Sequence, residues 1–110
     1  MLTITKAAAE QIRAAARPAG SENMALRIAA TREADGSIHY GMGFDELRVN
    51  DLELSSEGIE LLVSEHSKAL LTGAVLDYVE LQPGDHQFIF INPNDPTHKS
   101  PPDGAAIGGA

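Results

Sequence analysis

Cysteine is absent from the whole of the 110-residue sequence. The absence excludes disulfide bonds, cysteine nucleophiles and thiolate sites for zinc or for an iron–sulfur cluster built from this chain's own residues. Any metal that the chain ligates must be held by donors of another kind, of which carboxylate and imidazole are the candidates.

Basic residues are scarce as well. Eight Lys and Arg accompany sixteen Asp and Glu, so the formal net charge is −8. Because binding to phosphates depends on Lys and Arg, this balance argues against nucleic acid, and against an anionic membrane surface, as the main partner. Between Asp45 and Asp85 there are ten acids but only Arg48 and Lys68 as bases. We interpret that segment as a solvated surface, with a face for a basic partner as the alternative.

Long hydrophobic runs are missing too. No stretch approaches the ~18 apolar residues of a membrane-spanning helix. The opening MLTITKAAAEQIR carries a charge at Lys6 and no apolar run follows, so it is not typical of a signal peptide. We therefore expect a cytoplasmic protein. The chain length and the hydrophobic content of 43% predict one folded domain.

The N-terminal segment TKAAAEQIRAAARP predicts one amphipathic helix. Thr5 is a suitable N-cap, and Ile4 is the apolar residue before it. Pro18 and Gly20 end the helix. Small apolar residues recur on one face at helical spacing, which favours close packing against a sheet. These residues are Ala8, Ile12, Ala15 and Ala16.

Two strands that pair as a hairpin are predicted next. The segments MALRIAA and IHYGMGF both alternate with a period of two. The first places Met24, Leu26 and Ile28 on one face. Between the segments, Asp35-Gly36 indicates a type I′ turn, which requires positive φ at both central residues. The two strands should therefore be antiparallel.

The remaining sequence predicts short strands around one helix. Ser64 is the expected cap of a helix over SEHSKALLTG, and Gly73 ends it. The later strand QFIFIN is apolar on both faces, which is typical of a central, fully covered strand. The order of elements predicts an α+β domain, β-rich and mostly antiparallel, over residues 1–94. Residues 95–110, rich in Pro, Gly and Ala, are predicted to form a flexible tail.

The chemistry of the side chains indicates no enzyme. The histidines are His39, His66, His86 and His98. No two of them have the close spacing of a preformed metal site. A hydrolase-type triad can be written from Ser64 or Ser67 with His66 and Asp77. It lacks a nucleophile elbow and an oxyanion motif, so a small hydrolase-type enzyme is only a remote alternative to an acidic binding or scaffold domain.

The run from Leu61 to Asn94 resembles the HesB/IscA family, the A-type iron–sulfur carriers. The family-like features are a strand and a short helix with S..LL.G, then LDYV, then an apolar strand that ends in NPN. Upstream, ITKAAAEQI and LRIAATREADGSIHYGMGF resemble the family's opening strand and helix and the strand pair that follows. The resemblance covers nearly all of residues 2–94.

The resemblance implies a compact β-rich fold, a homodimer or higher oligomer, no enzymatic turnover, and handling of iron or a cluster during assembly. It also implies three cysteine ligands per chain, one in the loop of the strand pair and two after NPN. The matching positions here are Asp35, Lys99 and Pro101. Neither Pro101 nor a protonated Lys99 can ligate iron. Asp35 could bind a hard cation, but an Asp-Gly turn that replaces the ligand loop is the simpler interpretation.

The sequence therefore predicts a HesB/IscA-like accessory or regulatory binding protein, related to iron–sulfur cluster assembly, that holds neither a cluster nor another cofactor on its own residues. Its partners would be assembly or client proteins, and a hetero-oligomer with a cysteine-bearing relative is a further possibility. The alternative is a mononuclear iron-binding protein that uses Asp35, His39 and His98, with the tail folded back over the hairpin.

Overall fold

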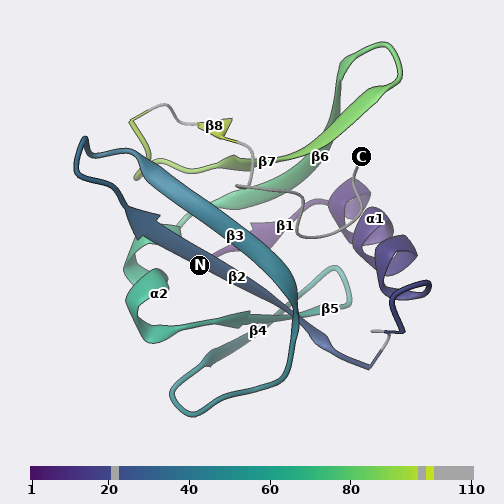
Figure 1. Cartoon of the computed structure of the whole chain (residues 1–110), viewed down its shortest axis with the longest axis horizontal. Helices are drawn as coiled ribbons and strands as arrows, with labels where there is room; N and C mark the ends of the chain where they lie inside the picture. Colours follow the sequence, from purple (N-terminus) through teal and green to yellow (C-terminus); the bar gives the residue numbers. More distant parts are fainter. Residues whose placement is uncertain (21–22, 97–98, 101–110) are drawn as a thin grey trace.

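The structure is a computed structural model that describes residues 1–20, 23–96 and 99–100 (Figure 1). The helices are α1 (Lys6–Ala16) and α2 (Glu65–Leu71). The strands are β1 (Thr3–Ile4), β2 (Ala25–Arg32), β3 (Ile38–Asp45), β4 (Leu52–Ser56), β5 (Ile59–Val63), β6 (Val75–Gln82), β7 (Asp85–Ile91) and β8 (Lys99–Ser100). This order confirms the predicted α+β, β-rich class.

The strands form two four-stranded sheets, with the orders β1-β6-β7-β8 and β3-β2-β5-β4. The pairs β1–β6 and β2–β5 are parallel, and the pairs β2–β3, β4–β5, β6–β7 and β7–β8 are antiparallel, as the sequence predicts for most of the sheet. In Figure 1, α1 and α2 lie on opposite sides of the molecule, and the β2–β3 hairpin runs diagonally between them. The tip of the β6–β7 hairpin projects beyond the rest of the fold.

The hydrophobic core joins the two sheets. Phe90 of β7 stacks on Tyr40 of β3, with ring centroids 4.3 Å apart and an interplanar angle of 6°. The other large and fully buried apolar side chains are Ile12, Leu26, Ile28, Leu61, Val63, Leu71 and Leu76. They come from both helices and both sheets, and burying each contributes roughly 1.5–3 kcal/mol. This shared core is the main source of stability.

Helix α1 begins and packs as predicted. Thr5 Oγ1 accepts a hydrogen bond from Ala8 N at 3.1 Å and donates one to Asp77 Oδ1 at 2.6 Å. The same hydroxyl therefore caps the helix and joins it to β6. Ala8, Ala9, Ile12 and Ala16 are buried on the small-sided face. Such short side chains let the helix approach β6 closely.

Strands β2 and β3 form the predicted antiparallel hairpin, but the predicted turn type is wrong. The two strands are joined by residues 33–37, and within them only Gly36 has positive φ, at 90°. Gly36 N donates to Glu33 O at 3.0 Å, and Glu33 N donates to Ser37 O at 2.8 Å. A longer loop closed by one left-handed glycine thus replaces the type I′ turn, and Asp35 keeps an ordinary backbone conformation.

Two predictions about burial also need correction. Met24 precedes β2 and is 45% exposed, so it does not share the buried face of Leu26 and Ile28. Strand β7 is central as predicted, because it lies between β6 and β8. It is not fully covered, however, since only Phe88 and Phe90 are buried and the alternate residues are half-buried.

Ser64 precedes α2 as predicted, but its hydroxyl does not cap the helix. It donates instead to Ser67 Oγ at 3.1 Å, and Ser67 Oγ accepts a hydrogen bond from Ala30 N at 3.0 Å. Strand β5 pairs with β2 only from Leu26 to Ile28. Ser67 therefore supplies a hydrogen-bond partner to the β2 backbone at Ala30, just beyond the end of this pairing. The buried Ser67 hydroxyl therefore has a structural role.

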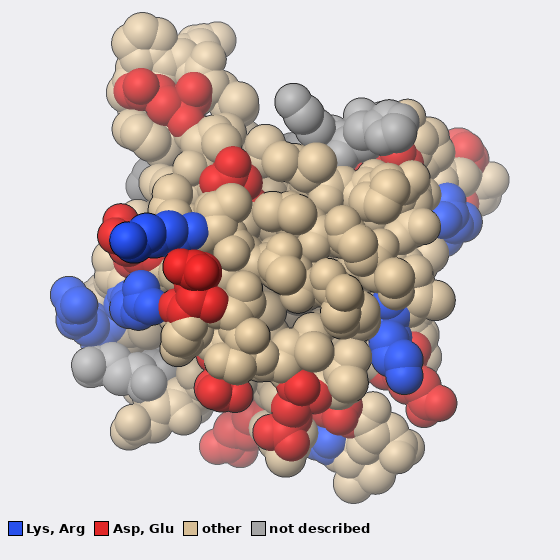
Figure 2. Space-filling model, turned by 180° about the vertical axis from the view of Figure 1, so that it is seen from behind, with Lys and Arg blue, Asp and Glu red and all other residues tan. Residues whose placement is uncertain are grey.

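A cluster of charges ties β2 to the end of β3 and to the loop between β3 and β4. Arg27 Nε lies 2.7 Å from Asp45 Oδ2, and Arg27 Nη2 lies 2.6 Å from Asp51 Oδ2. The hydrogen bonds from Arg27 lower the pKa of Asp51 to about 2 and also lower the pKa of Asp45. Viewed from behind, acidic side chains gather at the lower edge of the molecule, whereas Lys and Arg lie mostly toward its sides (Figure 2).

We expect acid to weaken this cluster. Because the pKa of Asp51 is lowered in the folded state, its ion pair stabilises the fold at pH above about 4, and this contribution is lost as the pH falls from about 4 to about 2. Between pH 7 and pH 2.5, the Tm of the wild type should fall further than the Tm of Asp51→Asn. The control Glu10→Gln, which removes an exposed carboxylate from α1, should behave as the wild type. Equal losses in the wild type and Asp51→Asn would contradict this account.

Candidate functional site

The NPN segment, Asn92–Asn94, closes the C-terminus of α2. Asn92 Nδ2 donates to Leu70 O at 2.7 Å, and Asn94 Nδ2 donates to Leu70 O at 3.2 Å and to Thr72 O at 2.9 Å. The last carbonyls of a helix lack partners within the helix, and these two amides supply them. The bonds hold the chain that follows β7 against α2.

A buried chain of hydrogen bonds continues from this segment to β3. Asn92 Nδ2 donates to Tyr40 Oη at 3.0 Å, and Tyr40 Oη donates to Asp95 Oδ2 at 3.0 Å. The three residues are at most 1% exposed, and we name them the Tyr40 clamp. Burial is the main cause that raises the pKa of Tyr40 to about 12. The hydroxyl therefore stays protonated at neutral pH and remains a donor to Asp95.

Asp95 lies in the segment 95–110 that the sequence assigns to a flexible tail. Its side chain is buried in the Tyr40 clamp. Further along, β8 pairs with β7, with Lys99 opposite Ile91. The packed part of the chain therefore extends past the predicted boundary at residue 94, while residues 101–110 lie outside the described part.

Arg32 joins the two segments in which the resemblance places the cluster ligands. Its Nη1 donates to Gly36 O at 2.6 Å, and its Nη2 donates to Asn94 O at 3.3 Å. The first carbonyl belongs to the loop of Asp35, and the second precedes the strand of Lys99. The positively charged guanidinium thus links the two segments by these two hydrogen bonds, which we name the Arg32 bridge. Sequence reasoning missed it, because no local pattern shows that these segments meet.

The predicted ligand Asp35 is engaged within its own loop. Its Oδ1 accepts hydrogen bonds from Ser37 Oγ at 2.6 Å and from Ser37 N at 3.0 Å, and these bonds lower the pKa of the exposed carboxyl. His39 is exposed on β3, and its Nδ1 lies 3.3 Å from Glu33 Oε1. Asp35 and His39 therefore share one hairpin, but each contacts a neighbour within that hairpin.

The described residues contain no group of three His, Asp or Glu side chains that could hold a metal ion. His98 and Pro101, however, lie outside those residues, and Lys99 is placed in β8. The predicted site of Asp35, His39 and His98 therefore stays a prediction.

The members of the possible hydrolase triad have other partners. Asp77 Oδ1 accepts a hydrogen bond from Thr5 Oγ1 at the start of α1. Ser67 Oγ bonds the backbone of Ala30 in the other sheet, and His66 is exposed on α2. These contacts explain the serine and the aspartate as structural residues and give the hydrolase hypothesis no support.

Comparison with the sequence models of known protein families identifies the family of this chain. The sequence model of a family described as "Iron-sulphur cluster biosynthesis" matches residues 1–95. This chain belongs to that family. The HesB/IscA resemblance of the sequence is thereby confirmed, and the match runs through the NPN segment and Asp95.

Curated relatives match most of the chain. The iron-sulfur cluster insertion protein ErpA of Acidithiobacillus ferrooxidans is 35% identical over 98 residues, which are 88% of this chain and 78% of the relative. The ErpA protein of Xanthomonas campestris pv. campestris is 36% identical over 97 residues, which are 87% of this chain and 75% of the relative.

Solved structures of the family share the fold. The structure of IscA with a [2Fe-2S] cluster gives a TM-score of 0.66 at 26% identity and covers 84% of this chain and 83% of that chain. The structure of Escherichia coli SufA, described as involved in the biosynthesis of iron–sulfur clusters, gives a TM-score of 0.69 at 25% identity and covers 97% of this chain and 91% of that chain.

The residues at the positions where the resemblance places the cluster ligands offer no thiolate. Iron–sulfur clusters are held by thiolates, and this iron–sulfur cluster biosynthesis protein has none. Asp35 offers a hard carboxylate oxygen, whereas Pro101 has no donor atom in its side chain. The chain thus combines the fold of the family with a donor set that cannot reproduce thiolate ligation.

Proposed function

We propose that this chain is an accessory protein of iron–sulfur cluster biosynthesis that acts through protein contacts and does not hold a cluster on its own side chains. The observation that carries the proposal is the absence of cysteine from a chain that matches the family over residues 1–95. A fold that is kept without its thiolates still offers its surfaces to other proteins of the pathway.

The Arg32 bridge supports the proposal. Between the hairpin loop and the chain after β7, the guanidinium donates to Gly36 O and Asn94 O. In a cluster carrier, metal ligation would join these same two segments. Here two charge-assisted hydrogen bonds join them, and a fixed positive charge repels a metal cation from the same space.

We further propose that the protein works in the cytoplasm as a homodimer, or in a hetero-oligomer with a cysteine-bearing relative, and performs no enzymatic turnover. In the described part of the chain, neither helix has the length or the apolar character needed to cross a bilayer. In a hetero-oligomer the relative would supply the thiolates, and this chain would supply the contact surfaces.

Anaerobic reconstitution tests the proposal. The purified protein is incubated with ferrous iron and then with sulfide, desalted, and analysed for iron, sulfide and visible absorbance. We expect the wild type to retain neither iron nor sulfide, because thiolate ligands are lacking. Retention of both in stoichiometric amounts would overturn the proposal.

Three variants make the experiment decisive. A variant that combines Asp35→Cys, Lys99→Cys and Pro101→Cys restores the predicted ligand positions and is expected to bind iron and sulfide, which would show that only the donors are missing. If the wild type instead retains iron without sulfide, and Asp35→Ala or His98→Ala abolishes retention, the mononuclear iron protein is the correct alternative.

A further inference from the structure

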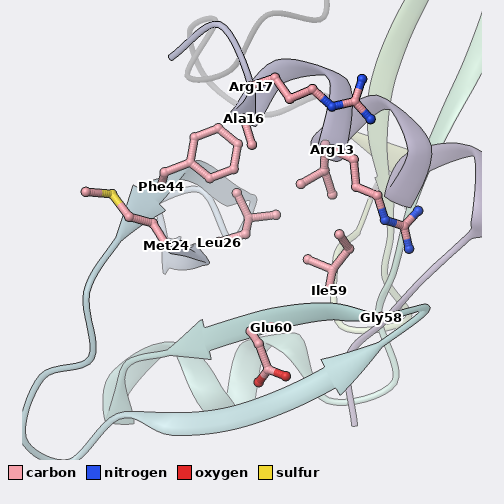
Figure 3. Close-up of a pocket in the computed structure, with 10 residues that line it drawn as sticks. Arg13, Ala16, Arg17, Met24, Leu26, Phe44, Gly58, Ile59 and Glu60 are labelled. Carbon is pink, nitrogen blue, oxygen red and sulfur yellow. The ribbon is translucent and has the colours of Figure 1, made fainter. Parts of the chain in front are cut away.

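A cleft lies between the C-terminal half of α1 and the ends of β2, β3 and β5 (Figure 3). It has a volume of about 340 Å³, which is within the size range of ligand pockets. We name it the Arg13–Arg17 cleft. The residues that line it are Ile12, Arg13, Ala16, Arg17, Met24, Leu26, Phe44, Gly58, Ile59 and Glu60.

The floor of the Arg13–Arg17 cleft is apolar and open. Leu26 forms its buried base, while Phe44 and Ile59 are only half-buried. Met24 at the rim is 45% exposed, although most of the large apolar residues of the described chain are covered. In Figure 3, Leu26, Phe44 and Ile59 lie around a common hollow, whereas the Met24 side chain extends away from it. An exposed apolar surface of this kind is a favourable place for an apolar group of a partner.

The helix side of the cleft is basic. Arg13 in the last turn of α1 and Arg17 at its C-cap lie one turn apart, and Arg13 Nη2 donates to Glu57 O in the turn between β4 and β5. Arg17 is exposed, and within the described part of the chain it makes no ion pair. Glu60 is the acid of the lining, and in Figure 3 its carboxylate points away from the apolar side chains.

The charge of the whole protein makes this cleft distinctive. The formal net charge is −8, and the lower edge of the molecule in Figure 2 is acidic. An acidic partner is therefore repelled by most of the surface, but it meets two guanidinium groups beside an apolar floor at this cleft. Arginine forms planar paired hydrogen bonds with carboxylates, which would orient such a partner.

We infer that the Arg13–Arg17 cleft is a docking site for an acidic segment of a partner protein that presents a large apolar side chain next to Asp or Glu. The apolar side chain enters the hollow over Leu26, Phe44 and Ile59, and the neighbouring carboxylate pairs with Arg17. The inference goes beyond the proposed function, because docking here requires neither iron nor a cluster. It is also independent of the Arg32 bridge, which involves other elements of the fold.

Fluorescence anisotropy with a labelled peptide tests the inference. The probe is a short peptide in which Asp and Glu alternate with Leu and Phe, and its two controls replace the acids by Lys or the apolar residues by Ser. We expect saturable binding of the acidic–apolar probe alone, weakened at high salt because the carboxylate contact is partly exposed. Failure of the probe to bind at millimolar protein, or equal binding of the Lys peptide, would overturn the inference.

Matched variants locate the site. Arg17→Glu should weaken binding of the probe by about tenfold or more, because it turns an attraction into a repulsion. Ile59→Ala, at a half-buried position of the floor, should weaken binding through loss of apolar contact. Lys68→Glu makes the same change in net charge on α2, outside the cleft, and should leave binding unchanged. Equal effects of Arg17→Glu and Lys68→Glu would show a net-charge effect and overturn the assignment to the cleft.

A small organic anion is the competing occupant. Anilinonaphthalene sulfonate combines an apolar body with one negative charge and reports binding by its fluorescence. If this dye binds in an Arg17-dependent manner and the peptide does not, the peptide site is overturned in favour of a small-molecule site. Because neither readout involves iron, a negative result here leaves the reconstitution test of the proposed function unaffected.

Discussion

Replacing Phe90 by alanine is expected to lower the free energy of unfolding by about 3–5 kcal/mol. The Phe90 side chain is fully buried in β7, at the centre of the core between the two sheets. It stacks on Tyr40 with ring centroids 4.3 Å apart. The truncation leaves a cavity against Tyr40, and it also removes the aromatic contact that positions the Tyr40 clamp.

Urea denaturation of Phe90→Ala, Phe90→Leu and Tyr40→Phe measures this effect. Phe90→Leu refills most of the volume and should lose clearly less stability than Phe90→Ala. Tyr40→Phe keeps the stacked ring but removes the hydroxyl, so it isolates the contribution of the hydrogen bonds to Asn92 and Asp95. A loss below about 1 kcal/mol in Phe90→Ala would show that the contact between the sheets is not central to stability.

Asn92→Ala is expected to destabilise the protein by about 3 kcal/mol, because several buried groups lose their partner together. The Asn92 amide donates to Leu70 O and to Tyr40 Oη, and its Oδ1 accepts a hydrogen bond from Asn94 N at 3.0 Å. The side chain is fully buried, so water cannot easily replace these bonds. The end of α2 and the start of the segment after β7 should loosen together.

The matched control for Asn92→Ala is Asn94→Ala. Asn94 also donates to Leu70 O, but it is exposed, so water can replace its bonds and the loss should be about 1 kcal/mol or less. Hydrogen exchange of the α2 amides provides a second readout and should accelerate much more in Asn92→Ala. Equal destabilisation by the two variants would argue against the buried network as the cause.

Both effects matter because domains of this size are marginally stable, by about 5–15 kcal/mol. Asn92 bonds Asn94, whose carbonyl accepts from Arg32, and Arg32 also donates to Gly36 in the hairpin loop. The resemblance places the family ligands in this loop and in the β8 segment. Loss of the Tyr40 clamp is therefore expected to separate these two segments. The variant with three restored cysteines should bind a cluster only while the clamp is intact.

Local patterns predicted most of the secondary structure. The cap at Thr5 and the spacing of Ala8 and Ile12 predicted α1, and the period of two predicted β2 and β3, because both signals depend on neighbouring residues. The predicted type I′ turn at Asp35 was wrong, because the conformation of this loop does not depend on neighbouring residues alone. Its dipeptide is compatible with several loops, and the register between β2 and β3 selected one that needs positive φ only at Gly36.

Long-range contacts could not be predicted in the same way. The hydrogen bond between Ser67 and Ala30 spans 37 positions, and that between Arg32 and Asn94 spans 62. The missing nucleophile elbow argued against Ser67 as a nucleophile, but no local pattern showed that its hydroxyl bonds the backbone of β2. The spacing of Arg13 and Arg17 was visible in the sequence, but the apolar floor beside them comes from strands distant along the chain.

The sequence by itself determined the absence of thiolate chemistry, the acidic surface, the α+β class and the family, because composition, periodicity and motif order are properties of the chain. Only the tertiary structure decided that Asp95 is buried, that Arg32 joins the hairpin loop to the chain after β7, and that an apolar cleft with a basic side remains open. These features depend on which segments, distant along the sequence, pack against one another in the fold. That choice is made by burial of the whole core, and no local pattern encodes it.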